Sequence, residues 1–104
     1  MSGIPELFIL ELLSGQEMYG YEIVEAIKLR TREAILLREG VVYPVLHGLQ
    51  KSGKLRARKM KVNGRERIYY QTTVKGSQRL AELHEEWHRV SSSVDLMMKP
   101  HAAS

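Results

Sequence analysis

The middle of the chain carries a block of basic side chains, which are the groups that bind anions. Between residues 51 and 75, nine positions are Lys or Arg and only Glu66 is acidic. Residues 1–27 have the opposite balance, with five Glu and no Lys or Arg. A block of like charge of that size attracts a polyanion, and Lys and Arg neutralise phosphates. We therefore expect a phosphate-binding surface, the alternative being a solvated basic face without a partner.

Few other residues have the spacing of a reactive site. His84 and His88 lie four residues apart and would share one helix face, but two ligands are too few for a zinc site. His47 and His101 suggest no further cluster. The chain has no Cys, which excludes disulfides and thiolate metal sites. Without a Gly-rich phosphate loop or a recognisable Ser-His-Asp pattern, we expect no enzyme activity, no metal and no cofactor.

Length and composition indicate one globular domain. The chain has 104 residues, of which 43% are hydrophobic and 27% charged, and so short a chain gains stability from burial against a partner subunit. The apolar run at residues 7–10 is interrupted by Glu11 and no basic segment precedes it. We therefore expect neither a signal peptide nor a spanning helix, and a soluble protein of the cytoplasm.

Three helices are predicted before the basic block. Residues 4–13 are apolar on nearly all sides, which is typical of a buried helix, and Ser14-Gly15 follows as a stop. After a loop at residues 16–20, apolar positions 23, 24 and 27 indicate a half-exposed second helix. Residues 31–39 fit either a helix end or a short strand at 35–37. A third helix is predicted from Val41, with Pro44 in its first turn and an end at Ser52-Gly53.

A β-hairpin and a long helix are predicted to follow. Asn63-Gly64 separates residues 55–62 from residues 65–72, and this pair favours a type I′ turn because both residues must adopt positive φ. Thr73 is expected to cap a final helix of about 37 Å. Its apolar residues are spaced alternately three and four apart, as in a heptad seam: Leu80, Leu83, Trp87, Val90, Val94 and Met97.

Three helices followed by a basic hairpin form the winged helix-turn-helix arrangement, with the hairpin as the wing. The predicted fold is therefore mainly α with a small β-hairpin, a winged helix-turn-helix plus a long C-terminal dimerisation helix. We assign residues 1–73 to the DNA-binding domain and residues 74–98 to the dimerisation helix. Residues 99–104 are expected to be a disordered tail.

Three segments in this order resemble the PadR family of transcriptional regulators. They are Tyr19-Gly20-Tyr21-Glu22-Ile23, Gly40-Val41-Val42-Tyr43-Pro44-Val45-Leu46 with Leu49 and Gly53, and Gly64-Arg65 through Tyr69-Tyr70 to Thr73 with Gly76. Together they span roughly residues 5 to 80. The resemblance implies a dimeric DNA-binding repressor that an effector releases from its operator. The single last helix is similar to the short subfamily, in which that helix is the main dimerisation element.

Two positions depart from the family pattern. Gly48 stands inside the third helix where a long polar or basic residue is usual, and Thr72 replaces an apolar residue. Gly48 offers no side chain to a base and costs about 1 kcal/mol of helix propensity, so it weakens any forecast of base contacts.

The third helix of this fold enters the major groove, and its exposed face reads base edges. Together with the wing and the start of the second helix, this predicts the DNA-binding residues Tyr21, Val41, Tyr43, His47, Lys51, Arg58, Lys59, Lys61, Arg65 and Arg67, with Gln50 as a further candidate. Lys61 and Arg65 flank the turn and are best placed to reach phosphates, whereas the strand alternation puts Ile68 and Tyr70 on the core side.

Two tyrosines of this set have alternatives. For Tyr21, a phosphate contact at the helix N-terminus competes with a packed core tyrosine. For Tyr43, the family counterpart implies a contact with DNA backbone or bases, whereas the alternative makes Tyr43 and His47 ordinary surface residues of an amphipathic helix.

The apolar stripe of the last helix needs a partner. We expect it to pack against the same helix and the first helix of a second subunit through Leu7, Leu80, Leu83, Trp87, Val90, Val94 and Met97. Such a twofold dimer would recognise a pseudo-palindrome in double-stranded DNA. Trp87 is either a large interface anchor or, as the subfamily resemblance implies, part of a pocket for a planar aromatic effector. Candidate effector-binding residues are Phe8, Leu83, Trp87 and Val90.

The rival interpretation is a winged-helix module for protein–protein contact without specific DNA binding. The basic block argues against it, and steep salt dependence of DNA binding would discriminate the two.

Overall fold

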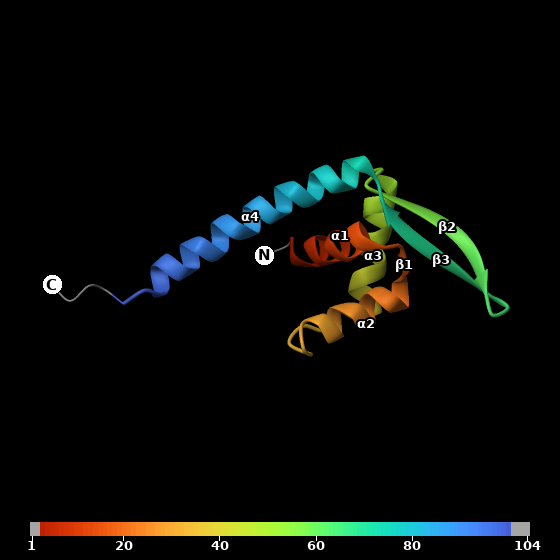
Figure 1. Cartoon of the computed structure of the whole chain (residues 1–104), viewed down its shortest axis with the longest axis horizontal. Coiled ribbons are helices and arrows are strands. Elements are labelled where there is room, and N and C mark those ends of the chain that lie inside the picture. The colour runs from red at the N-terminus through yellow and green to blue at the C-terminus, as the bar shows by residue number, and fades with distance from the viewer. Residues whose placement is uncertain (1–2, 101–104) are drawn as a thin grey trace.

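The computed structural model describes residues 3–100, and their elements follow the predicted order (Figure 1). Four helices and a small antiparallel sheet make up the fold of these residues: α1 (Ile4–Gly15), β1 (Met18–Tyr19), α2 (Gly20–Arg30), α3 (Glu39–Lys51), β2 (Leu55–Val62), β3 (Arg65–Thr72) and α4 (Val74–Met98). This confirms the fold class, a winged helix-turn-helix with a long last helix. Of the expected tail, residues 101–104 and with them His101 lie outside the described residues.

Helix α1 forms the centre of the core because it is apolar on nearly all sides. Ile9 and Leu10 are completely inaccessible, and Ile23 of α2 and Leu46 of α3 are equally buried against them. Only one face of α2 and α3 is apolar, so each turns its other face outward. The core therefore fixes the orientation of α3 relative to the rest of the domain.

The sheet has three strands in the order β1-β3-β2. Strands β2 and β3 pair along their whole length, with Leu55 opposite Thr72 and Val62 opposite Arg65. Asn63 and Gly64 connect them with φ values of 53° and 78°, as a type I′ turn requires. The hairpin prediction is thus confirmed, whereas β1, which pairs with Tyr69 and Tyr70 of β3, was not predicted.

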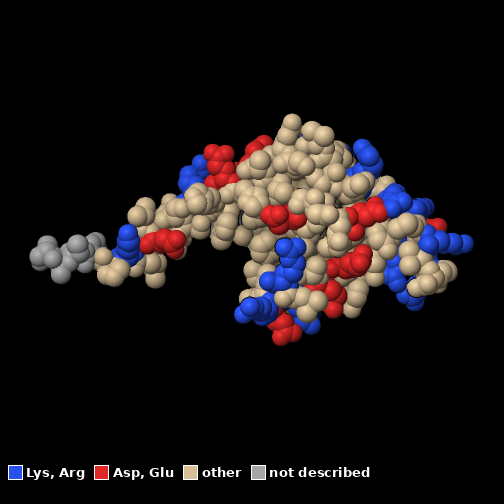
Figure 2. Space-filling model, viewed as in Figure 1, with Lys and Arg blue, Asp and Glu red and all other residues tan. Residues whose placement is uncertain are grey.

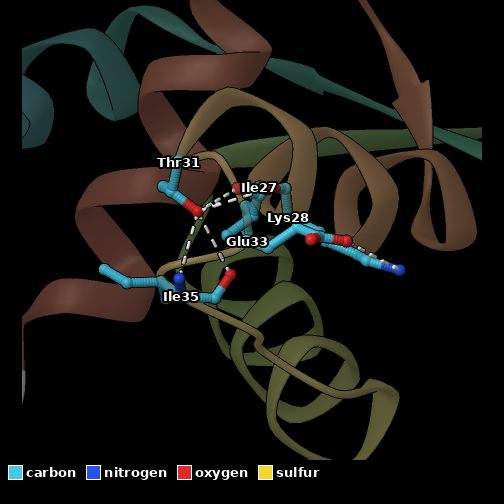
Figure 3. A network of polar contacts seen from close by, with 5 residues as sticks. All are labelled: Ile27, Lys28, Thr31, Glu33 and Ile35. Carbon is cyan, nitrogen blue, oxygen red and sulfur yellow. Dashed lines mark hydrogen bonds and ion pairs between the residues drawn. The ribbon is translucent and has the colours of Figure 1, made fainter.

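Residues 31–38 form a loop rather than the strand considered for residues 35–37. The Thr31 hydroxyl donates to the carbonyl oxygen of Ile27 at 2.7 Å and accepts from the Ile35 N–H at 3.1 Å (Figure 3). Arg32 and Glu33 adopt positive φ, and the Glu33 N–H closes the turn on the carbonyl oxygen of Lys28 at 2.7 Å. One half-buried hydroxyl therefore holds together both ends of the turn that leads into α3.

Helix α3 begins at Glu39, two residues before the predicted start at Val41. Pro44 consequently lies in the second turn, not in the first turn as expected. Because Pro44 has no N–H, the carbonyl oxygen of Gly40 lacks its usual helical partner. The predicted end at Ser52-Gly53 is confirmed, since α3 ends at Lys51 and Gly53 has a φ of 79°.

The end of α3 and the start of α4 meet at Thr73. Its hydroxyl donates to the carbonyl oxygen of Gly53 at 2.7 Å and accepts from the Gly76 N–H at 3.1 Å, which confirms the predicted cap. A Cβ atom at Gly76 would overlap the carbonyl oxygen of Lys54. The first turn of α4 is therefore in direct backbone contact with the turn that follows α3.

Helix α4 and the wing project from opposite ends of the molecule, whose longest extent is 68 Å (Figure 1). The first half of α4 lies along α1, where Arg79 binds Glu6 at 3.1 Å and Leu83 is buried. The second half extends beyond the domain. Within residues 3–100, no helix combines the length and apolar character needed to span a bilayer.

Candidate nucleic-acid interface

The outer face of α3 presents the side chains predicted to face DNA. Val42, Leu46 and Leu49 are buried and Val45 is half-buried, so the core-facing set is as the sequence predicted. The exposed residues of the opposite face are Val41, Pro44, His47, Gly48, Gln50 and Lys51. Polar groups able to read base edges are therefore concentrated towards the C-terminal half of α3.

Tyr43 is half-buried because its ring lies against the first turn of α2. A methyl group at Gly20 would lie 2.6 Å from Cε1 of Tyr43, so the ring occupies the space beside the Gly20 backbone. The His47 ring lies on the other side, with the two ring centres 6.2 Å apart. Burial raises the pKa of Tyr70, and Tyr43 packs against the core to which Tyr70 belongs. Tyr43 is therefore fixed between α2, α3 and the sheet.

Tyr21 is 53% exposed, which argues against the packed core tyrosine considered as its alternative. It is the second residue of α2, where the first backbone N–H groups have no helical partner. The N–H of Tyr19, the residue just before α2, donates to the Glu22 carboxylate at 3.1 Å. Tyr21 thus lies at the surface, beside the first turn of α2.

The wing is anchored to the domain along its middle by a set of residues that we call the wing root and define as Glu17, Tyr19, Arg58, Arg67 and Tyr69. Arg58 binds Glu17 through two hydrogen bonds, one of them 2.9 Å from Nε to Oε2. These hydrogen bonds lower the pKa of Glu17 and raise the pKa of Arg58. Arg58 is therefore neutralised by a residue 41 positions earlier in the chain.

Aromatic rings complete the wing root. The Arg67 guanidinium lies 4.2 Å from the centre of the Tyr19 ring, a cation–π contact, and Tyr19 meets Tyr69 edge to face at 5.4 Å. Arg67 is half-buried. The protein itself thus binds both arginines of the wing root, Arg58 and Arg67, which were predicted to contact DNA.

The turn of the hairpin, residues 61–65, is the wing tip and is free of such contacts. Lys61 and Arg65 are exposed, and neither forms an ion pair with any residue in the described range 3–100. Lys59, two residues before the tip, lies 3.9 Å from Glu66. Lys61 and Arg65 are therefore free to bind an external anion.

A hollow of about 240 Å³ lies between α3 and the wing. His47 and Gln50 of α3 line it together with Lys59, Ile68 and Tyr70 of the wing. Tyr70 is buried as predicted, but Ile68 is 45% exposed and does not belong to the core. The expectation for Ile68 was wrong because α3 covers the sheet only as far as Tyr70, so the next residue on that face reaches solvent.

Basic side chains gather over the wing in Figure 2, and a second group lies over the end of α2 and the following loop. The exposed arginines between the end of α2 and the start of α3 are Arg30, Arg32 and Arg38. Arg38 is the residue immediately before α3 and was not among the predicted DNA contacts. Arg38 was missed in the sequence because α3 was expected to begin at Val41, whereas the helix begins at Glu39.

The residues predicted for the dimer interface fall into two groups. Leu7 and Leu83 are buried within the single chain, where α1 packs on α4, and Leu80 is half-buried beside them. Further along α4, Trp87, Val94 and Met97 are exposed, Met97 by 84%. Leu96 and Met98, which the seam prediction did not include, are exposed as well. Only the second half of α4 therefore carries an uncovered apolar surface.

The candidate effector residues do not all lie together. Leu83, Trp87 and Val90 line a hollow of about 300 Å³ with Ile4 and Leu7. Phe8 lies apart from them, in a hollow of about 210 Å³ between α1 and the end of α2. The structure thus brings together three of the four predicted residues.

The histidines of α4 have no metal-binding arrangement. Nε2 of His84 lies 2.6 Å from the Glu11 carboxylate of α1. Within residues 3–100, no three His, Asp or Glu side chains come close enough together to hold a metal ion.

Comparisons with known proteins agree with this geometry. The model of the transcriptional regulator PadR-like family matches residues 9–82. The chain belongs to the PadR-like family. An uncharacterised protein of Lysinibacillus sphaericus is 36% identical over 98 residues, which cover 93% of this chain and 90% of that protein. The family prediction made from the three sequence segments is therefore confirmed.

Solved structures of transcriptional regulators share the fold. A transcriptional regulator from Clostridium thermocellum has a TM-score of 0.86 and 28% identity, covering 93% of this chain and 92% of that one. A PadR-like transcriptional regulator from Bacillus cereus has a TM-score of 0.80 and 30% identity, covering 95% of each chain. This PadR-like protein is thus a DNA-binding transcriptional regulator.

Proposed function

We propose that this PadR-like protein binds double-stranded DNA as a homodimer and represses transcription until a small aromatic effector releases it. Residues 1–73 of each subunit bind one half-site and residues 74–98 hold the subunits together. The observation that carries the DNA-binding part is the hollow shared by His47 and Gln50 of α3 and Lys59 of the wing. Because the helix and the wing line the same hollow, their side chains form one continuous surface on which a duplex fits.

On this surface each predicted contact has a distinct role. Val41, His47, Gln50 and Lys51 face the major groove, where α3 enters it, whereas Tyr43, whose phenol lies at the first turn of α2, donates to a phosphate. Tyr21 and the open amides of α2 bind one phosphate. Lys61 and Arg65 at the wing tip bind phosphates beside the adjacent minor groove, and Lys59 and Arg38 add charge at the edges. Arg58 and Arg67, held in the wing root, contribute mainly by fixing the angle of the wing.

The DNA-binding proposal is tested by selecting bound fragments from random duplex DNA and measuring the affinity of the selected fragment at increasing salt. We expect a pseudo-palindrome whose half-sites lie about one helical turn apart. The logarithm of the association constant should fall linearly with the logarithm of the salt concentration, with a slope of about −0.9 for each phosphate contact. A protein that enriches no sequence and shows no salt dependence would instead be a protein-interaction module.

The second half of α4 supports the homodimer. Trp87, Val94, Met97 and Met98 are exposed along one face of a helix that extends beyond its own domain (Figure 1). Monomeric soluble proteins rarely expose so continuous an apolar surface. A second copy of α4 covers it most simply, because a twofold axis then places the two α3 helices on one side of a duplex.

Sedimentation velocity tests the dimer with the variant Val94→Glu. The new carboxylate would be buried between subunits without a partner, so we expect the dimer to dissociate at micromolar protein concentrations. Gln78→Glu adds the same charge to the exposed first half of α4 and should stay dimeric. A wild-type monomer would disprove the dimer while leaving DNA binding by single domains open to direct measurement.

The effector part of the proposal rests on the hollow beside Trp87. Its volume of about 300 Å³ and its apolar residues Ile4, Leu7, Leu83 and Val90 suit a planar aromatic compound. Such a compound would stack on the indole ring and quench its fluorescence. The chain has a single Trp, so quenching reports on this site alone. If a broad panel of planar aromatics leaves the emission unchanged, Trp87 is an interface anchor only.

A further inference from the structure

We propose that Gly20 is a positioning residue for DNA binding, because its missing side chain lets the Tyr43 ring lie across the first turn of α2. This role rests on the DNA-binding surface proposed above and concerns how one of its contacts is held in place. Gly20 is buried and belongs to α2, whereas Tyr43 belongs to α3. The contact between them therefore joins the two helices of the helix-turn-helix.

The backbone conformation does not explain a glycine at position 20. Among the described residues, the glycines with positive φ are Gly53 and Gly64 only. Gly20 therefore has a backbone that alanine adopts without strain, and alanine has the higher helix propensity. What excludes a side chain is space, since a Cβ atom would lie 2.6 Å from Cε1 of Tyr43 and closer still to its phenol oxygen.

The Tyr43 ring has little freedom to move away from an added methyl group. The centre of the His47 ring lies 6.2 Å from that of the Tyr43 ring, and Tyr43 packs against the buried core that includes Tyr70. The backbone at Tyr43 is constrained as well, because Pro44 restricts the residue that precedes it. A methyl group at position 20 would therefore displace the ring from α2 or separate the two helices.

The position of the phenol matters because of what surrounds it. Tyr43 reaches the N-terminal turn of α2, where Tyr21 is exposed and the first backbone N–H groups have no helical partner. A phenol O–H donates to a phosphate oxygen, as a backbone N–H does. With Gly20 in place, the phenol and the amides of α2 can bind the same phosphate. Displacing the ring would separate these donors.

A double-mutant cycle tests this role, with fluorescence anisotropy of a labelled mixed-sequence duplex of about three helical turns at low salt. We expect Gly20→Ala and Tyr43→Ala each to weaken binding by about tenfold, as for loss of one hydrogen bond to a charged group. In the Tyr43→Ala background, where the ring is gone, Gly20→Ala should have no further effect. Gly15→Ala, a helical glycine with open space around it, is the matched control and should bind like wild type.

Two results of the cycle would overturn the role. If Gly20→Ala leaves binding unchanged, the ring does not depend on the space at Gly20. If it weakens binding by the same factor in both backgrounds, Gly20 acts independently of Tyr43, for instance by letting a phosphate approach its backbone. Thermal melting of each variant identifies a loss of affinity that comes only from unfolding.

A nuclear magnetic resonance measurement separates failure of this role from failure of DNA binding. The ring current of Tyr43 should shift the Gly20 Hα resonances upfield, and Tyr43→Ala should abolish that shift. If the shift is present but wild-type protein binds no duplex, the packing is right and the proposed function is wrong. If the shift is absent although duplex is bound, the positioning role of Gly20 is wrong.

Discussion

The root and the tip of the wing carry the same kinds of side chain but use them differently. At the root, Arg58 is bound by Glu17 and Arg67 lies over Tyr19. At the tip, Lys61 and Arg65 are exposed and form no ion pair with the rest of residues 3–100. The number of cations in a basic hairpin therefore overstates how many phosphates it can bind, because some of these cations hold the hairpin in place.

The largest effect is expected from removing the buried anchor next to the root. Tyr70 is buried between the sheet and α3, so Tyr70→Ala should lower the free energy of unfolding by about 3–5 kcal/mol, as for other large aromatic truncations. Urea denaturation measures this change. Tyr70→Phe keeps the ring and should cost much less. An equal loss in both variants would assign the stability to the hydroxyl instead of the ring.

The next largest effect concerns DNA binding by the wing tip. Lys61→Ala or Arg65→Ala should weaken binding to every sequence and reduce the salt slope by about 0.9 for each lost phosphate contact. Anisotropy titrations over a range of salt concentrations measure both quantities. Lys99→Ala removes the same charge at the far end of α4 and should leave the slope unchanged. An unchanged slope for the tip variants would remove the tip from the interface.

Arg67→Ala tests the wing root, where we expect the stability to change and the salt slope of DNA binding to stay the same. Losing the cation–π contact with Tyr19 should lower the free energy of unfolding by about 0.5–1 kcal/mol, while the salt slope stays as in wild type. The two measurements together decide the matter. A slope that falls as far as in Lys61→Ala would mean that Arg67 leaves Tyr19 for a phosphate, and the distinction between root and tip would disappear.

The smallest effect is the pH dependence of the Glu17–Arg58 pair. The hydrogen bonds from Arg58 lower the pKa of Glu17 in the folded protein. Its stabilising contribution is therefore fully present above the pKa of the unfolded chain, about 4.3, and is lost as the pH falls through the lower folded value. The melting temperature of Glu17→Gln should lie slightly below wild type at neutral pH, and the gap should close in acid. A gap that widens in acid would show that the carboxylate destabilises the root.

Local rules predicted the parts of the fold that local chemistry determines. Asn63-Gly64 predicted the turn because few other pairs adopt positive φ twice, and Thr73 predicted the cap of α4 because its hydroxyl accepts from an amide three residues later. The buried face of α3 followed from helical spacing. These features depend on residues within about one turn of each other.

Contacts between residues far apart along the chain could not be predicted from the sequence. Strand β1 has two residues and no periodicity of its own, so its pairing with Tyr69 and Tyr70 is visible only in the folded chain. The partner of Arg58 lies 41 positions away. Exposure of Ile68 depends on where α3 stops covering the sheet. For the same reason, charge counting led us to expect a phosphate-binding surface in residues 51–75 but could not divide its cations between root and tip.

The junction at Thr73 has a mechanical consequence. The hydroxyl that caps α4 also binds the carbonyl oxygen of Gly53, and the Gly76 backbone touches the carbonyl oxygen of Lys54. The first turn of α4 therefore lies directly against the turn that follows α3. A ligand that tilts α4 at Trp87 would therefore rotate this helix about Thr73. The C-terminal end of α3 would be displaced as a result.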